Sequence, residues 1–316
     1  MDGEPRRRRH YGALLLVVAI LAMIILLFVF LYGKLKVADA ERRARESNAT
    51  SRVVALVAVE PCAYLVERVA GNAADVAVLT PKGKSPEDYA PTPSQLAQLS
   101  ATRLFFTVGL PIEERFTSKI LELARDAKVV DLTVGVDTLE DECGHEDGAH
   151  EDDAIDPHLW TSPEIARHMV RQIADAFAAL DPVNESNYRA NAAALDAELE
   201  ELQRSARAKL DPYRDRIFIV YHPAYGYFAR EFHITQRAIE VNGKAPRPKE
   251  LEALVSAARE SGARAIIVQP EFNRSSAQTV ADMIGAELID HSPLEKDYFR
   301  NMTSLVDAVV ESMGRE

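Results

Sequence analysis

The sequence predicts an α/β protein of two lobes, each a parallel sheet flanked by helices, joined by one long rigid helix and preceded by a transmembrane helix. Short apolar runs alternate with amphipathic stretches in two parts of the chain, and this alternation is typical of parallel sheets. A long segment without Gly or Pro separates the two parts. With 316 residues, of which 47% are hydrophobic, the chain can bury one large core or two smaller ones.

The first 51 residues predict a membrane anchor. Residues 1–11 form a basic segment that is expected to stay cytoplasmic. Residues 12–33 are uncharged and almost wholly apolar, and about 20 such residues suffice to cross a bilayer as a helix. Residues 34–51 form a polar tether, so the remainder is expected on the extracytoplasmic (periplasmic) side of the cytoplasmic membrane, held by an uncleaved helix. Ala38-Asp39-Ala40 resembles a small-residue cleavage site, and release as a soluble protein is the alternative.

Residues 52–183 are predicted to form the N-terminal lobe. Its expected strands are Val53–Val59, Val76–Leu79, Leu104–Val108 and Lys128–Asp131, and its expected helices are Cys62–Ala70, Pro93–Leu99, Ile112–Arg125 and one from Ser162 to about Leu180. Residues 184–211 are predicted to form the linking helix, because they are dense in Ala, Leu, Glu and Arg. Residues 212–316 are predicted to form the C-terminal lobe, with strands Ile217–Tyr221, Gln236–Glu240, Ala265–Gln269 and Glu287–Asp290 and helices Ala224–Glu231, Pro248–Ser261, Ser275–Gly285 and one from about Asp297.

Four segments place metal-competent side chains near the ends of predicted strands, where open α/β sheets bind their ligands. They carry Glu87 in a proline-stiffened loop, His158 in an Asp-Pro-His sequence, His222 after an apolar strand, and Asp290 with His291 after the last strand. Each residue alone has an ordinary explanation, as a solvated loop residue or a helix cap. Because each lobe contributes two of the four segments, together they predict a divalent-metal site in the cleft between the lobes.

Several motifs occur in a fixed order from about Arg52 to the C-terminus. They are VVALVAVEPCAYLVERVAGNAADVAVL, SPEDYAPTP, DPHLWTSP, DPVNESNYRAN, YHPAYGYFAREF, QPEFNRSSAQTVADMIGA and SPLEKDYFRNM. Together they resemble the substrate-binding component of zinc/manganese ABC transporters, the ZnuA-type metal-binding protein family. The resemblance implies two lobes linked by a rigid helix, a metal ion held between them with His158 and His222 as ligands, and delivery to a membrane permease.

The sequence departs from the family pattern at two positions. Glu87 stands where the family usually has a histidine, and Ser292 stands where it usually has an aspartate. Asp290, His291 or a water molecule would therefore have to complete the site. Zn²⁺ is the expected ion, and the exchange of imidazole for carboxylate leaves Mn²⁺ and Fe²⁺ as alternatives.

The expected function is high-affinity binding of a divalent metal outside the cytoplasm and its delivery to an ABC permease. Nucleic acid is not an expected partner, because the net charge is −12 and no basic block follows the N-terminus. The chain is not expected to be an enzyme, since it contains no HExxH and no GxSxG motif. A metal-dependent hydrolase, or an adhesin or signalling relative that lost metal binding, are the rival functions. Cys62 and Cys143 form a disulfide or stay free, and the acidic, His-containing loop of residues 141–153 gathers cations weakly or is only a solvated loop.

Overall fold

The computed structural model describes Met23, residues 32–34, Lys36 and residues 52–140, 155–240, 247–272 and 274–314, the side chain of Pro248 excepted. The residues from Arg52 onward form one compact unit. Almost all of the predicted membrane anchor and tether lies outside the described residues. Within the described part of the chain, no helix combines the length and the apolar character needed to cross a membrane.

The N-terminal lobe contains a four-stranded parallel sheet in the order β2-β1-β3-β4. Its strands are β1 (Val53–Val57), β2 (Ala74–Val78), β3 (Leu104–Thr107) and β4 (Lys128–Asp131). Its helices are α2 (Glu60–Ala70), α3 (Pro93–Ala97), α4 (Pro111–Leu123) and α5 (Pro163–Leu180). Each of the four carries a proline in its first turn, where a missing backbone N–H costs no helical hydrogen bond.

The C-terminal lobe repeats this architecture with the sheet order β6-β5-β7-β8, again all parallel. Its strands are β5 (Ile217–Val220), β6 (Thr235–Ala238), β7 (Ala265–Val268) and β8 (Glu287–Asp290), and its helices are α7 (Gly226–Phe232), α8 (Pro248–Ser261), α9 (Arg274–Ile284) and α10 (Tyr298–Met313). The prediction of two parallel sheets flanked by helices is confirmed.

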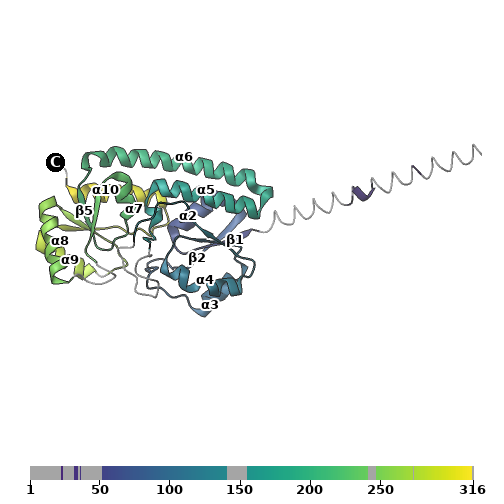
Figure 1. Cartoon of the computed structure of the whole chain (residues 1–316), viewed down its shortest axis with the longest axis horizontal. Coiled ribbons are helices and arrows are strands. Elements are labelled where there is room, and N and C mark those ends of the chain that lie inside the picture. Colours follow the sequence, from purple (N-terminus) through teal and green to yellow (C-terminus); the bar gives the residue numbers. More distant parts are fainter. Residues whose placement is uncertain are drawn as a thin grey trace, which may run out of the picture. The chain divides into compact units, whose positions relative to one another are not determined.

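Helix α6 (Glu185–Leu210) runs along both lobes (Figure 1). Its 26 residues give a length of about 39 Å at the usual rise per residue. The helix contacts α2 and α5 of the N-terminal lobe and α10 of the C-terminal lobe. At one end Asn191 donates to the backbone oxygen of Val69 at 3.0 Å, and at the other Lys209 pairs with Asp307 at 2.6 Å. The helix is thus fastened to each lobe.

The two lobes also share one hydrophobic core. The larger cluster of buried side chains contains Leu56 and Phe105 of the first sheet together with Phe218 and Leu305 of the second lobe. A smaller cluster lies around α8 and α9. The two lobes therefore pack directly against each other over this shared core, without solvent between them.

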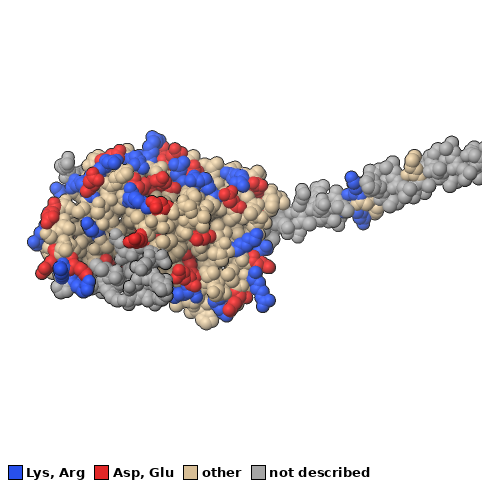
Figure 2. Space-filling model, in the orientation of Figure 1, with Lys and Arg blue, Asp and Glu red and all other residues tan. Residues whose placement is uncertain are grey.

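Charged side chains of both signs are intermixed on the face of the molecule that Figure 2 shows. Ion pairs between α5 and α6 account for part of this pattern, because Arg167 and Arg171 both contact Asp196 at 2.9–3.0 Å. Such exposed or half-exposed pairs contribute little stability each. The acidic excess of the sequence is therefore not gathered into one patch on that face.

Candidate metal centre

Three predicted ligands come together at the junction of the lobes. Glu87, His158 and His222 each offer one ligand atom, and these atoms all lie within 4.8 Å of one another. The Oε1 atom of Glu87 is 2.9 Å from Nε2 of His222 and 4.0 Å from Nε2 of His158. Since Glu87 follows β2 and His222 follows β5, the carboxyl ends of both sheets face the same junction, as expected for this class of sheet.

The loop between β2 and α3 positions Glu87. The backbone N–H of Glu87 donates to Oγ of Ser85 at 3.2 Å, and the N–H of Tyr89 donates to the Ser85 carbonyl at 3.2 Å. From α4, the guanidinium of Arg115 donates to the Glu87 carbonyl at 2.9 Å. The backbone of Glu87 is thus held on both sides, and its side chain, only 10% exposed, is directed into the cluster.

A single aspartate orients His158. Oδ1 of Asp156 lies 2.8 Å from Nδ1 of the imidazole and also accepts the backbone N–H of His158 at 2.9 Å. This fixes the ring so that Nε2 is left for the cluster, the arrangement in which carboxylates commonly support metal-binding histidines. Gly226 is needed beside this carboxylate, because a Cβ atom there would lie 2.9 Å from Oδ2 of Asp156.

His222 is held by three residues of the C-terminal lobe. Its Nδ1 atom lies 2.8 Å from Oε2 of Glu240, which is buried just after β6. The side chain of Gln269 accepts the N–H of His222 at 3.2 Å and donates to its carbonyl at 2.8 Å. The ring of Phe272 stacks on the imidazole with centroids 4.5 Å apart. Both histidines therefore have Nδ1 on a carboxylate and Nε2 in the cluster.

The charges around His222 favour a cation at its imidazole. Burial alone would lower the pKa of His222, but hydrogen bonds to Glu240 and Glu87 and the charges of both carboxylates outweigh it and raise the pKa to about 9. The imidazolium is therefore the dominant form at neutral pH when no ion is bound. A metal ion bound to Nε2 would take the place of that proton.

Asp290 and His291, the predicted fourth ligands, lie outside this cluster. Asp290 is exposed at the end of β8 and pairs with Arg274 of α9. His291 is buried, and both of its ring nitrogens have partners, with Nδ1 at 2.9 Å from the Tyr225 hydroxyl and Nε2 at 3.1 Å from the Asn301 carbonyl. Burial lowers the pKa of His291. Neither side chain therefore belongs to the group of converging ligand atoms.

Among the described residues, Cys62 and the remaining histidines are not part of the cluster. Cys62 is a free, buried thiol in α2, and burial together with the charge of Glu113 raises its pKa, so it is not a thiolate ligand. Cys143 and the acidic loop of residues 141–153 lie outside the described residues. His168 bonds through Nε2 to the Val134 carbonyl at 2.9 Å, which is a structural role.

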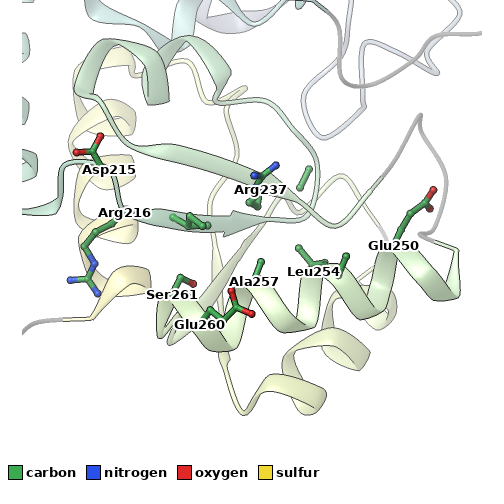
Figure 3. A pocket seen from close by; sticks show the side chains of 11 residues that line it. Asp215, Arg216, Arg237, Glu250, Leu254, Ala257, Glu260 and Ser261 are labelled. Carbon is green, nitrogen blue, oxygen red and sulfur yellow. The ribbon is translucent and has the colours of Figure 1, made fainter.

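A wide groove of about 810 Å³ lies elsewhere, between the edge strand β6 and helix α8 (Figure 3). Arg237, Glu250, Leu254 and Glu260 are among its lining side chains, and none of the described residues that line it is a histidine or a cysteine. Its lining shares no residue with the Glu87 cluster. It therefore offers nothing to that site.

The residues that sequence reasoning missed are Glu240, Gln269 and Phe272. Glu240 carried a usable signal, since it is an acid at the carboxyl end of a predicted strand. Its backbone N–H donates to the Tyr221 carbonyl at 2.9 Å, which places it beside His222 across the β5–β6 pair. Gln269 and Phe272 had no comparable signal, because their contacts depend on the turn that follows β7.

The two-lobe fold and the cluster of Glu87, His158 and His222 together define a class, that of two-lobe α/β proteins with a candidate metal site at the junction of the lobes. The family model described as ZnuA, zinc-uptake complex component A, periplasmic, matches residues 55–312, and the chain belongs to this family. A crystal structure of ZnuA superposes with a TM-score of 0.77 at 32% identity and covers 84% of this chain and 100% of its own. A ZnuA deletion mutant with zinc bound gives 0.78 at 31% identity, with coverages of 84% and 100%.

Curated relatives are named for zinc and for manganese. The zinc-binding protein AdcA of Streptococcus pyogenes is 26% identical over 295 residues, which is 87% of this chain and 56% of AdcA. The chain thus spans about half the length of the first such relatives. The manganese-binding lipoprotein MntA of Halalkalibacterium halodurans is 27% identical over 228 residues, 71% of this chain and 73% of MntA. These relatives are metal-binding proteins by name, and both metals occur among them.

Proposed function

We propose that this protein binds a divalent transition metal, zinc in the first place, through Glu87, His158 and His222, and delivers it to an ABC permease for uptake. Mn²⁺ and Fe²⁺ are the alternative ions. The observation that carries the proposal is the convergence within 4.8 Å of three donor atoms, one on the half-buried Glu87 and two on the buried His158 and His222. Carboxylate support at Nδ1 of both histidines strengthens it, because such support orients imidazoles for metal binding.

Binding replaces the waters of the ion by protein donors and expels a proton from His222. The carboxylates of Glu87, Asp156 and Glu240 lie against the two imidazoles of the cluster. A dication brings one more positive charge to these carboxylates than the His222 proton that it displaces, so the charges of the site favour the metal. Three protein ligands leave the fourth tetrahedral position to water, since Asp290 and His291 have other partners.

The site is proposed to lie on the periplasmic side, with the N-terminal 33 residues as an uncleaved membrane anchor. The uncharged apolar run of residues 12–33 and the basic segment before it support this arrangement. The family's periplasmic description supports the location of the binding lobes.

The test is the metal content of the purified full-length chain, prepared without chelator and then supplied with zinc or manganese. About one ion per chain is expected, and the variant with both His158→Ala and His222→Ala should bind none at the same ion concentration. His168→Ala is the matched control, because it removes a histidine outside the cluster. A content below about 0.1 equivalent, without thermal stabilisation, would reject the proposal.

A hydrolase would also keep one water on a three-ligand zinc. The side chains of the cluster are at most 10% exposed, which leaves a substrate ester no access to such a water. Turnover of a model ester or phosphate by the metal-loaded chain would favour the hydrolase. A chain that folds but binds no metal would favour the adhesin or signalling relative instead.

A further inference from the structure

A tyrosine hydroxyl from α7 holds the segment that leads to His158. Tyr227 is buried in the first turn of α7, in the C-terminal lobe. Its hydroxyl donates to the backbone carbonyl of Asp156 at 2.7 Å and accepts the backbone N–H of Leu139 at 3.2 Å. Both partners lie between β4 and α5 of the N-terminal lobe, so these hydrogen bonds cross the junction of the lobes. Burial raises the pKa of Tyr227 to about 12, and the hydroxyl therefore keeps its proton at neutral pH.

The two partners of this hydroxyl are also bonded to each other. The N–H of Asp156 donates to the Leu139 carbonyl at 2.9 Å, and the adjacent residues Glu140 and Ile155 form an antiparallel bridge. Leu139 thus holds the N–H of Asp156, and Tyr227 holds its carbonyl. The backbone of Asp156 is therefore fixed on both sides, once from each lobe.

Asp156 in turn fixes His158. Its Oδ1 atom lies 2.8 Å from Nδ1 of the imidazole and accepts the backbone N–H of His158 at 2.9 Å. Pro157, which stands between them, has a fixed φ and leaves this short segment little freedom. On the other side, the His158 carbonyl accepts the N–H and the hydroxyl of Thr161 at 3.1 Å and 2.8 Å. The orientation of the imidazole therefore depends on where the Asp156 carboxylate lies.

The start of α7 lies directly against both partners of the hydroxyl. Gly226 precedes Tyr227, and a Cβ atom on it would lie 2.9 Å from Oδ2 of Asp156 and 3.1 Å from Cδ1 of Leu139. From the next turn of α7, the guanidinium of Arg230 lies over the Tyr227 ring, 5.3 Å from its centroid. The ring is thus held in place within α7, and its hydroxyl has a fixed position relative to Asp156.

We propose that Tyr227 is a positioning residue of the metal centre, whose hydroxyl fixes the backbone of Asp156 and thereby holds His158 in the orientation that binds the ion. This role rests on the proposed metal binding by the Glu87 cluster. It makes the position of His158, a ligand from the N-terminal lobe, depend on a helix of the C-terminal lobe.

The first experiment compares the zinc affinities of full-length variants by competition with a chromophoric chelator at pH 7. Tyr227→Phe removes only the hydroxyl, and the affinity should fall by about fivefold or more, because the carboxylate that supports His158 loses its fixed position. Tyr188→Phe is the matched control. It also removes the hydroxyl of a buried tyrosine, which bonds to Oδ2 of Asp181 at 2.8 Å, outside the cluster, and the affinity should change less than about twofold.

A double-mutant cycle separates positioning from a general loss of stability. In a chain that already carries Asp156→Ala, the carboxylate between Tyr227 and His158 is gone, so Tyr227→Phe should then change the zinc affinity less than about twofold. The visible spectrum of Co²⁺ in the site gives a second readout, because it reports the geometry of the ligands. Tyr227→Phe should shift this spectrum, and Tyr188→Phe should leave it unchanged.

An unchanged zinc affinity in Tyr227→Phe would overturn the proposal. An equal loss with and without the Asp156 carboxylate would overturn it too, since the hydroxyl would then act only on stability. If Tyr227→Phe does not fold, hydrogen exchange of the unmodified chain decides. By reciprocity, zinc should slow exchange of the Leu139 N–H at least about fivefold more than that of the Asp181 N–H, and equal slowing would refute the coupling.

The two proposals fail in different ways. An unmodified chain that binds no zinc would reject the proposed function and this role with it. A chain that binds zinc with the same affinity in the unmodified and Tyr227→Phe forms would reject the role of Tyr227 alone.

Discussion

Metal binding is expected to release a proton from His222, and the affinity should therefore depend steeply on pH. The pKa of His222 in the empty site is about 9, because its hydrogen bonds to Glu240 and Glu87 outweigh the effect of burial. At pH 7 the ring is then about 99% protonated, and a metal ion must displace that proton. The apparent affinity of the protein for zinc at pH 7 should be about 100-fold lower than when the His222 ring is neutral. It should fall by about tenfold for each pH unit below 7.

Calorimetric titration of the full-length chain with zinc, in two buffers of equal pH and different ionisation enthalpy, measures the released protons. About one proton per ion is expected from His222 at pH 7. The Glu240→Gln variant should release fewer protons per bound zinc ion at pH 7, because the hydrogen bond to Glu240 is among the causes of the raised pKa of His222. His168→Ala should behave as the unmodified chain does. An affinity that is flat between pH 6 and pH 8, with no proton released, would refute this account of the site.

Further predictions concern the empty protein and the residues around the histidines. In the presence of a chelator, the stability that the His222 proton contributes should be fully present below pH 6.5 and should be lost as the pH rises through about 9. Urea unfolding should show this as a loss of about 3 kcal/mol in the free energy of unfolding, and the His222→Asn variant should not show it. Asp156→Asn should weaken zinc binding about 10–100-fold with the fold intact by circular dichroism, because the imidazole of His158 loses its orienting carboxylate. Gly226→Ala should weaken binding and destabilise the chain by about 1–3 kcal/mol in the same assays, since its Cβ would meet Oδ2 of Asp156 at 2.9 Å; an unchanged zinc affinity would contradict that reasoning. Trp160→Phe should lower the free energy of unfolding by about 1–3 kcal/mol through the orphaned Pro293 carbonyl, while a surface change such as Glu201→Gln should not.

The sheets were predictable because their strands are short apolar runs between helical stretches. The boundaries were less so. The first strand was expected to reach Val59 but ends at Val57, since Pro61 favours an early start of α2 at Glu60. The second was expected to begin at Val76 but begins at Ala74, because pairing with Val53 of β1 extends it. The start of β2 was thus set by its pairing with β1, which the local sequence pattern does not show.

The sequence pattern indicated where a candidate ligand lies along the chain, but it did not indicate the direction in which its side chain points. His222 lies just after β5, as expected, whereas His158 lies far beyond β4 and directly before the short helix Leu159–Thr161; their rings nevertheless meet, with centroids 5.4 Å apart. Asp290 and His291 have the same kind of position after β8, but consecutive side chains of an extended segment point to opposite sides. Asp290 points to solvent and Arg274, whereas His291 points inward to Tyr225. The side to which each points was fixed by packing against α9 and α10, which no short motif reveals.

The connections between the lobes also decide how an ion can enter. Besides the shared core, the indole of Trp160 donates to the Pro293 carbonyl at 2.8 Å, and the hydroxyl of Tyr298 donates to the Trp160 carbonyl at 2.8 Å. Separating the lobes would break these buried hydrogen bonds and expose apolar core, at a cost of many kcal/mol. Displacing the loop that carries Glu87 would break bonds nearer the surface, such as the exposed bond from Arg115. We therefore expect the loop to be the low-energy entrance and the two histidines to form the fixed half of the proposed site.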